Sequence, residues 1–215
     1  MNVVSVNVGL PRDISHQGKR ILSGIIKAPQ SGLVRVRALN LAGDAQADLT
    51  VHGGPNKAVY AYPVEHYEYW RQELAGYDFP MGSFGENLTT AGVFETDLNI
   101  GDRLCVGSVE LIVTQPRLPC FKLNAKFRRE DMVKKFLESR RTGFYFSVAR
   151  EGDIGAGNTI HFLTRDENRI SVADVTRLYA FERNDFAGMR RAVEVPDLPD
   201  SWRDYFRDRL QSATG

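Results

Sequence analysis

The segment Gln115-Pro116-Arg117-Leu118-Pro119-Cys120 places a thiol at the end of a short loop that directly follows an apolar run. Each proline fixes its own φ and biases the residue before it towards extended backbone, so the loop is expected to be stiff. Arg117 and Lys122 bring positive charge, which favours thiolate over thiol if they point towards the sulfur. Such a thiol suits a nucleophile or a ligand for a soft metal. The alternative is a small buried side chain with no chemical role.

Two glycine-rich clusters earlier in the chain carry further polar groups. In His52-Gly53-Gly54-Pro55-Asn56-Lys57, the paired glycines allow tight turns, and exposed amides beside Lys57 could form an anion site. A hairpin turn with a solvated lysine explains the same residues. In Gly85-Glu86-Asn87-Leu88, a carboxylate and an amide could recognise a heterocycle through hydrogen bonds, or could serve only the turn.

Several common site types are absent from the sequence. His52 and His66 do not form a His-x-x-x-His pair, and Cys105 and Cys120 do not form Cys-x-x-Cys, which counts against a structural zinc site. The chain has no Walker A loop, no Gly-x-Ser-x-Gly elbow and no strand-turn-helix Gly-x-Gly-x-x-Gly. This counts against a P-loop enzyme, an α/β hydrolase and a Rossmann dehydrogenase.

The composition is that of an ordinary globular protein. The 215 residues are 42% hydrophobic and 26% charged, with a net charge of +1 that gives no global attraction to a nucleic-acid polymer or an anionic membrane. The N-terminus lacks the pattern of a secretory signal, and no apolar run approaches the roughly 18 residues of a membrane span. Two cysteines are too few for a disulfide framework, so a cytoplasmic protein with reduced thiols is expected.

The elements that must position these groups are mainly strands up to about residue 163. Alternation of Val4, Val6 and Val8 with polar residues, and the pattern of residues 34–37, predict half-buried strands. Residues 104–106 and 109–114 predict a hairpin around Gly107-Ser108, and residues 144–149 and 159–163 predict another. Many short strands with glycine turns favour a barrel or sandwich.

Helical patterns interrupt the strands and then replace them. One helix is expected from Pro63 to Leu74 and another over residues 123–137. After a polar run near residue 165, Ser171, Asn184 or Asp185, and Asp200 or Ser201 are candidate N-caps of three helices. We therefore expect a strand-rich domain over residues 1–165 and a small three-helix domain over residues 168–215. Aromatic residues exposed on such an appended helical domain would allow a homodimer.

Taken together, the motifs in this order resemble the MOSC family, named for the C-terminal domain of molybdenum cofactor sulfurases, and most closely its YiiM-like branch. The segments that carry the resemblance are Gly43-Asp44-Ala45-Gln46-Ala47-Asp48-Leu49, residues 52–60, Gly85-Glu86-Asn87-Leu88, Gly101-Asp102 and residues 115–120. Residues 177–180 and 201–203 resemble the three-helix tail of that branch. One departure is Asn158 after Gly157, where the family usually has aspartate.

The resemblance implies a MOSC-type β-barrel that handles molybdenum cofactor (molybdopterin). Cys120 aligns with the family cysteine that binds molybdenum in related reductases, so it would be both the metal ligand and the catalytic residue. The residues implied for the anionic end of the cofactor are Lys57, Arg117 and Lys27, with the amides of Gly53 and Gly54. Those implied for the polar edge of the pterin or for the substrate are Asn87, Glu86 and His52.

The activity implied is reduction of a small N-hydroxylated substrate, such as a hydroxylaminopurine-type base, to an amine. Electrons would come from a separate reductase, and Asp48, Glu86 and His52 are the candidate proton-transfer groups. Two alternatives need the same thiol. Cys120 could carry a persulfide in a sulfur carrier or transferase, or the protein could bind the cofactor without catalysis.

Overall fold

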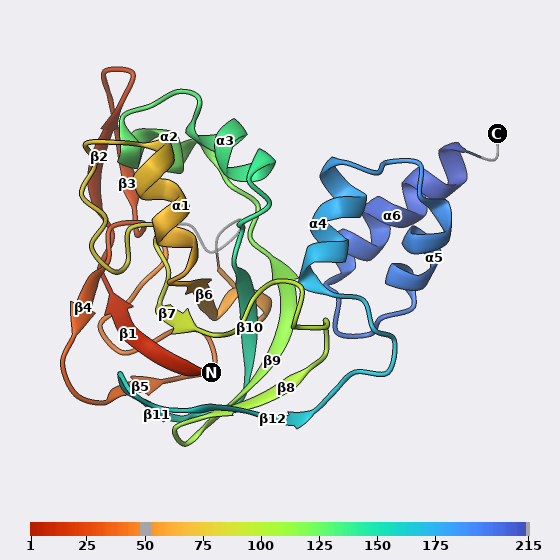
Figure 1. Ribbon diagram of the computed structural model, residues 1–215, viewed down its shortest axis with the longest axis horizontal. Coiled ribbons are helices and arrows are strands. Elements are labelled where there is room, and N and C mark those ends of the chain that lie inside the picture. Colours follow the sequence, from red (N-terminus) through yellow and green to blue (C-terminus); the bar gives the residue numbers. More distant parts are fainter. Residues whose placement is uncertain (48–52, 214–215) are drawn as a thin grey trace.

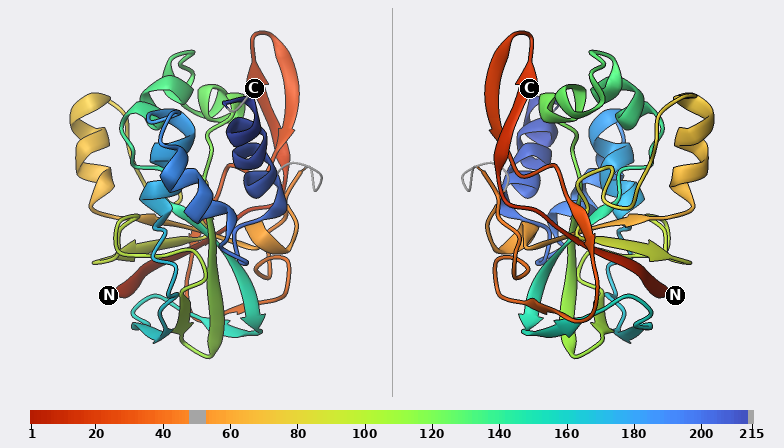
Figure 2. Two further views of the ribbon diagram at one scale, coloured as in Figure 1. Left: turned by 90° about the vertical axis from the view of Figure 1, so that its right-hand side faces the viewer. Right: turned by 90° about the vertical axis from the view of Figure 1, so that its left-hand side faces the viewer.

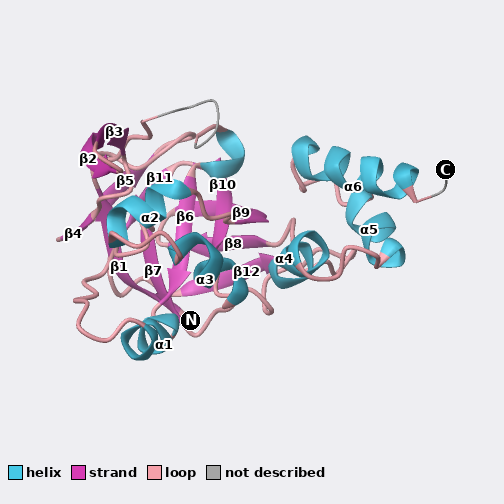
Figure 3. Ribbon diagram, turned by 90° about the horizontal axis from the view of Figure 1, so that it is seen from above, coloured by secondary structure: helices cyan, strands magenta, loops and turns pink. Residues whose placement is uncertain are grey.

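The computed structural model describes residues 1–47 and 53–213 as one large mixed sheet with two groups of helices (Figure 1). One group lies near one end of the sheet, and the other lies beside it as a C-terminal unit (Figures 2 and 3). Asp48 and His52, which the sequence singled out, lie outside the described residues. In the described part of the chain, no helix is both long and apolar enough to cross a membrane.

The large sheet has the strand order β12-β8-β9-β10-β6-β7-β1-β4, and only β6 and β7 are parallel neighbours. Its strands are β1 (Asn2–Val8), β4 (Ala28–Gln30), β6 (Val59–Pro63), β7 (Leu88–Ala91), β8 (Arg103–Val106), β9 (Val109–Pro116), β10 (Phe144–Arg150) and β12 (Ile160–Thr164). The edge strands β4 and β12 do not pair, so the sheet is not closed. Two backbone hydrogen bonds, Val3 N to Asn158 O at 2.9 Å and Gly157 N to Val3 O at 2.8 Å, tie β1 to the turn before β12. The expectation of a mainly β fold with added helices is confirmed.

The pairing of the strands confirms one predicted hairpin and contradicts the other. Strands β8 and β9 pair around Gly107, whose φ of +60° suits a residue without a side chain. The second hairpin is wrong, because β10 already has β9 and β6 on its two edges, and β12 pairs with β8 instead. The two smaller sheets pair β2 (Arg12–His16) with β3 (Lys19–Ser23), and β5 (Val34–Val36) with β11 (Gly152–Ile154).

Strand β1 does not have the predicted polar face. Its pairing with β7 contains an irregularity between Val3 and Ser5, and both Ser5 and Asn7 are buried. Asn7 accepts a hydrogen bond from the Ser5 hydroxyl at 2.8 Å and donates one to the Thr89 hydroxyl at 3.1 Å. Burial of these polar groups is tolerated because they bond to each other.

The helices are α1 (His66–Glu73), α2 (Phe121–Phe127), α3 (Met132–Glu138), α4 (Val172–Ala180), α5 (Phe186–Val193) and α6 (Asp200–Ser212). Pro63 belongs to β6, so the first helix begins later than expected. The single helix predicted over residues 123–137 is wrong, because Arg128 adopts a left-handed conformation (φ +51°) that ends α2. Ser171 caps α4 in a capping box with Asp174, as predicted. Asp185 caps α5, whereas the N-cap of α6 is Pro199 rather than Asp200 or Ser201.

Buried apolar side chains form two clusters. The larger one lies between the strands and continues into α4, α5 and α6. The smaller one is aromatic and lies under α1, α2 and α3, where it includes Tyr60, Tyr62, Trp70, Phe84 and Phe136. Since Tyr60 also reaches the pocket described below, this aromatic cluster supports the site from beneath.

Candidate cofactor site

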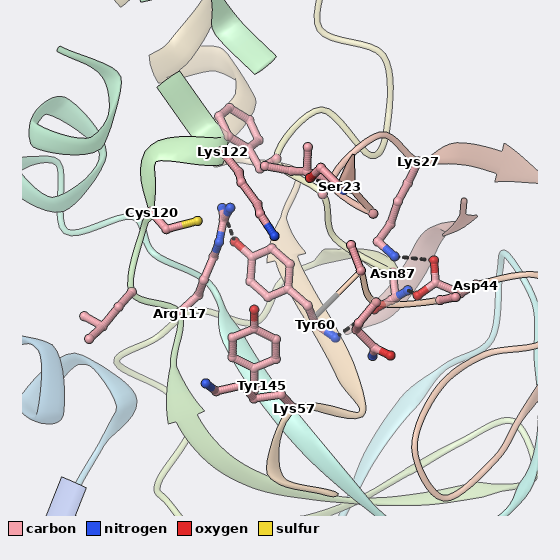
Figure 4. Close-up of a pocket in the computed structure, with 18 residues that line it drawn as sticks. Ser23, Lys27, Asp44, Lys57, Tyr60, Asn87, Arg117, Cys120, Lys122 and Tyr145 are labelled. Atoms are coloured by element: carbon pink, nitrogen blue, oxygen red, sulfur yellow. Dashed lines mark hydrogen bonds and ion pairs between the residues drawn. The ribbon is translucent and has the colours of Figure 1, made fainter. Parts of the chain in front are cut away.

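A pocket of about 670 Å³, counted with its open mouth, lies beside Cys120. Its wall comes from the loop 117–120 and the first turn of α2, from β6 and β10, from the short 3₁₀ turn η1 (Pro55–Lys57), and from the segments around residues 23–27, 44–47 and 84–87. Figure 4 shows Cys120, Arg117, Lys122, Tyr60 and Tyr145 gathered at one side of this hollow. The stiff loop after β9 therefore presents its thiol to a cavity, and Cys120 is half-buried rather than enclosed in the core.

Arg117 holds a buried positive charge next to the thiol. The guanidinium carbon lies 5.0 Å from the centre of the Tyr60 ring and 5.1 Å from that of Phe136, and Nη1 donates to the Tyr60 hydroxyl at 3.4 Å. Within the described residues, no carboxylate forms an ion pair with Arg117. Burial opposes its charge, but Tyr60, Tyr145 and Cys120 raise the pKa of Arg117 above its ordinary value. Arg117 thus stays cationic and faces the pocket without a compensating acid from the described chain.

The pocket wall is rich in cations. Lys27, Lys57 and Lys122 line it together with Arg117, whereas Asp44 is the one carboxylate among its described lining residues. Burial lowers the pKa of Lys57, and it also lowers that of Lys27, where the ion pair with Asp44 acts in the opposite direction. Since an anion would relieve the cost of burying these charges, the wall suits an anionic ligand.

Asn87 lines the pocket, but its amide is already used on both sides. Its Oδ1 accepts from the Tyr60 backbone N–H at 3.1 Å, and its Nδ2 donates to Asp44 Oδ2 at 2.9 Å. These bonds fix the loop before β7 to β6 and hold the carboxylate that pairs with Lys27. The structure therefore places Asn87 in the wall with its amide turned to the protein.

Glu86 is fully buried and is not part of the pocket wall. Its carboxylate accepts hydrogen bonds from the backbone N–H of Gly82 at 2.9 Å and of Phe84 at 3.0 Å, and from the Thr89 hydroxyl at 3.0 Å. The Tyr67 hydroxyl donates to it as well. Glu86 therefore organises the loop 82–86 from beneath the site.

The paired glycines also lie outside the wall. Gly53 and Gly54 are half-buried, and Gly54 has a φ of +91°, which explains why a glycine stands there. They precede η1, which carries Lys57 into the pocket, so their contribution in the described structure is to the turn.

The two tyrosines of the pocket wall were not among the candidate residues found from the sequence. Tyr60 in β6 and Tyr145 in β10 both line the cavity, with ring centres 5.0 Å apart. The Tyr60 hydroxyl donates to the Thr142 carbonyl at 2.8 Å. For the Tyr145 hydroxyl, the described residues offer no hydrogen-bond partner. Both tyrosines stand in apolar strands, so their sequence pattern is that of core aromatic residues, and only the folded structure shows that they reach the pocket.

The described residues contain no group of three or more His, Cys, Asp or Glu side chains able to hold a metal ion. Cys120 and Cys105 are both thiols, and only Cys120 lines the pocket. A metal at this site would therefore take one ligand from the described part of the chain and the others from a bound cofactor.

Comparison with known proteins identifies the family of this chain. The MOSC domain model matches residues 48–161, and the model of the YiiM-like 3-alpha helix domain matches residues 170–213. The protein YflK of Bacillus subtilis is 40% identical over 97% of this chain and 96% of its own length. A protein described as a reductase from Gibberella moniliformis is 33% identical over 91% of this chain, but this match covers 35% of that protein. The crystal structure of YiiM from Geobacillus stearothermophilus superposes with a TM-score of 0.82 at 34% identity and covers 97% of this chain and 98% of that one.

The fold and the site thus define a MOSC domain followed by a YiiM-like three-helix segment. The chain belongs to the MOSC family, in which the domain binds molybdenum cofactor. The residues of the pocket fit such a group, because a single accessible thiol and a cation-rich wall match a metal joined to an anionic pterin.

Proposed function

We propose that the protein is a molybdenum-cofactor-dependent reductase of small N-hydroxylated compounds. The observation that carries the proposal is that the Cys120 thiol and the buried Arg117 guanidinium line the same pocket, whose described wall also holds Lys27, Lys57 and Lys122. The reductase from Gibberella moniliformis, which is similar over most of this chain, supports the reaction class. The substrate class rests on the family resemblance.

The Cys120 thiolate would be the protein's ligand to molybdenum, and the stiffness of the loop between Pro116 and Pro119 would keep the sulfur in place. Arg117 and Lys57 would bind the anionic end of the cofactor, and Lys27 and Lys122 would add positive potential to the pocket. The loops held by Asn87 and Glu86 keep these cations at fixed positions.

The bound cofactor supplies the two-electron chemistry, so that R–NHOH with two electrons and two protons gives R–NH₂ and water. In the proposed reaction, the hydroxyl of Tyr145, a residue of the pocket wall, would donate a hydrogen bond to the hydroxyl oxygen of the substrate. Burial raises the pKa of Tyr145, which keeps this donor protonated. Electrons come from a separate reductase, and the reaction takes place in the cytoplasm.

The test compares wild type with Cys120→Ser and Cys105→Ser after expression in a host that makes the cofactor. Molybdenum per chain is measured first, and reduction of an N-hydroxylated purine with an artificial electron donor is measured second. We expect Cys120→Ser to lower turnover at least about 100-fold, because it removes the thiolate that the chain offers to the metal. Cys105→Ser is the matched control, since Cys105 lies in the β8 strand away from the pocket, and we expect it to retain activity.

Other outcomes would change the assignment. Molybdenum without turnover would indicate a cofactor-binding protein, and a labile sulfane sulfur on Cys120 would indicate a sulfur carrier. Loss of turnover in folded Cys105→Ser protein, with Cys120→Ser still active, would show that the pocket is not the site.

A further inference from the structure

A buried polar contact joins the C-terminal helices to the pocket scaffold. The indole N–H of Trp202 in α6 donates to Gln115 Oε1 in β9 at 2.7 Å, across a separation of 87 residues in the chain. Both side chains are almost fully buried, with 6% of Trp202 and 4% of Gln115 exposed. A buried indole N–H usually finds a hydrogen-bond partner, and here that partner belongs to the strand that leads to Arg117 and Cys120.

The amide of Gln115 has one orientation that satisfies its neighbours. Its oxygen accepts from Trp202, and its Nε2 donates to the Asn56 carbonyl at 3.1 Å. A flipped amide would turn its NH₂ group towards the indole N–H and its oxygen towards the carbonyl, and both contacts would then be repulsive. The indole therefore fixes the orientation of the Gln115 amide that donates to the Asn56 carbonyl, which also accepts from the Thr114 hydroxyl at 2.7 Å.

Gln115 stands where three parts of the pocket wall meet. Asn56 directly precedes Lys57 in η1, and Gln115 lies two residues before Arg117. Across the β9–β10 ladder, Gln115 is the register partner of Tyr145. One amide thus connects the segments that carry Lys57, Arg117 and Tyr145, all of which line the pocket.

We infer that Trp202 is a positioning residue through which the three C-terminal helices fix the spacing of Lys57 and Arg117, and thereby the cationic wall of the pocket. The inference gives the helical unit a role at a site that its own residues do not line. It concerns the pocket itself and goes beyond the proposed reaction, so it can be tested on protein without cofactor.

The test measures the positive potential at Cys120 in the Cys105→Ser background. Cys120 is alkylated at one pH with anionic iodoacetate and with neutral iodoacetamide, and the ratio of the two rates reports the local charge. Changes in access or in thiol ionisation affect both reagents and cancel in the ratio. We expect Trp202→Phe, which keeps an aromatic ring but loses the N–H, to lower the ratio about three-fold as the cations shift.

Two further variants separate positioning from stability. Phe206→Leu also loses buried volume from α6. The Phe206 ring packs 6.1 Å from that of Trp202 but has no polar group to bond Gln115, so we expect this variant to lower the unfolding midpoint and change the ratio much less than Trp202→Phe does. The double variant Trp202→Phe/Gln115→Leu removes both polar partners, and we expect it to regain stability relative to Trp202→Phe while the ratio stays low.

Two results would overturn the inference. The first is a ratio that remains at the wild-type value in both Trp202→Phe and the double variant. The second is an equal fall of the ratio in Phe206→Leu, because this would make the effect a general consequence of destabilising α6. Since no cofactor is used, neither result bears on the proposed reductase activity.

Discussion

The two carboxylates near the pocket have different relations to it. Asp44 lines the wall and pairs with Lys27, whereas Glu86 lies beneath the wall and accepts hydrogen bonds from the loop 82–86. A carboxylate that already accepts from two backbone N–H groups and two hydroxyls has little capacity left for a ligand. Its chemistry is that of a structural acceptor.

Glu86→Gln tests this assignment. The amide offers one acceptor oxygen instead of two and turns an NH₂ group towards backbone N–H donors, so we expect a loss of about 2–3 kcal/mol in the free energy of unfolding. Turnover per folded molecule should change little. Urea unfolding and activity are measured together, with Glu68→Gln on the exposed face of α1 as the control. Normal stability combined with lost turnover would instead make Glu86 a proton-transfer group.

At the residue scale, the sequence identified the groups whose signals are local. Cys120 and Arg117 stand out because prolines and charges surround them in one short stretch, and Lys57 because it follows paired glycines. Tyr145 stands between Phe144 and Phe146 in an ordinary strand pattern, and only the assembled sheet shows that it faces a cavity. The sequence also could not show that Asn87 lines the pocket while its neighbour Glu86 lies beneath it, because burial depends on the assembled fold.

At the scale of elements, the sequence pattern predicts one helix over residues 123–137, whereas the structure has two, α2 and α3. Residues 128–131 contain no glycine or proline, so nothing in the sequence predicts that the helix ends there. The break is stabilised by Asn124, whose Nδ2 donates to the Glu130 carbonyl at 2.9 Å and whose Oδ1 accepts from the Val133 N–H at 2.8 Å. Side-chain bonds of this kind override helix propensity.

Helix α2 also holds the loop between β3 and β4 through a half-buried lysine, Lys126. Lys126 Nζ donates to the Ile25 carbonyl at 3.1 Å and to the Gly82 carbonyl at 2.8 Å, and Ile25 is part of the pocket wall. Burial lowers the pKa of Lys126 to about 7, and Glu86 counteracts this only in part. Between pH 7 and the unfolded value of 10.5, the unfolded chain therefore binds a proton that the folded chain does not.

It follows that the free energy of unfolding rises with pH across this window, by up to about 1.4 kcal/mol per unit from this group alone. Below pH 7 both states carry the proton, so Lys126 adds no further pH dependence. We expect Lys126→Met to remove this rise, as measured by urea unfolding at pH 7 and pH 9. Lys134→Met, a change on the exposed face of α3, should keep the wild-type difference. An identical rise in Lys126→Met would mean that the lysine is charged when folded.

At the scale of the molecule, the sheet and the C-terminal helices share one core. Leu111 and Val113 of β9 belong to the same buried cluster as Val172, Leu178 and Phe206 of the helical unit. The division into residues 1–165 and 168–215 remains a prediction about how the chain is organised. A continuous apolar core nevertheless couples the two parts energetically, since neither can unfold without exposing the other.

The two tryptophans allow this coupling to be tested. Trp70 of α1 belongs to the aromatic cluster, whereas Trp202 of α6 belongs to the larger cluster. The chain has no other tryptophan, so each of the two reports on one part of the molecule. In Trp70→Phe protein, we expect the urea midpoint of Trp202 fluorescence to coincide with that of far-UV circular dichroism, because one shared core gives one cooperative transition. The absolute midpoint should fall, since Trp70 donates to the Tyr62 hydroxyl at 2.6 Å and is fully buried. Loss of the Trp202 signal at a clearly lower urea concentration would show that the helices separate first and that the two parts do not unfold as one unit.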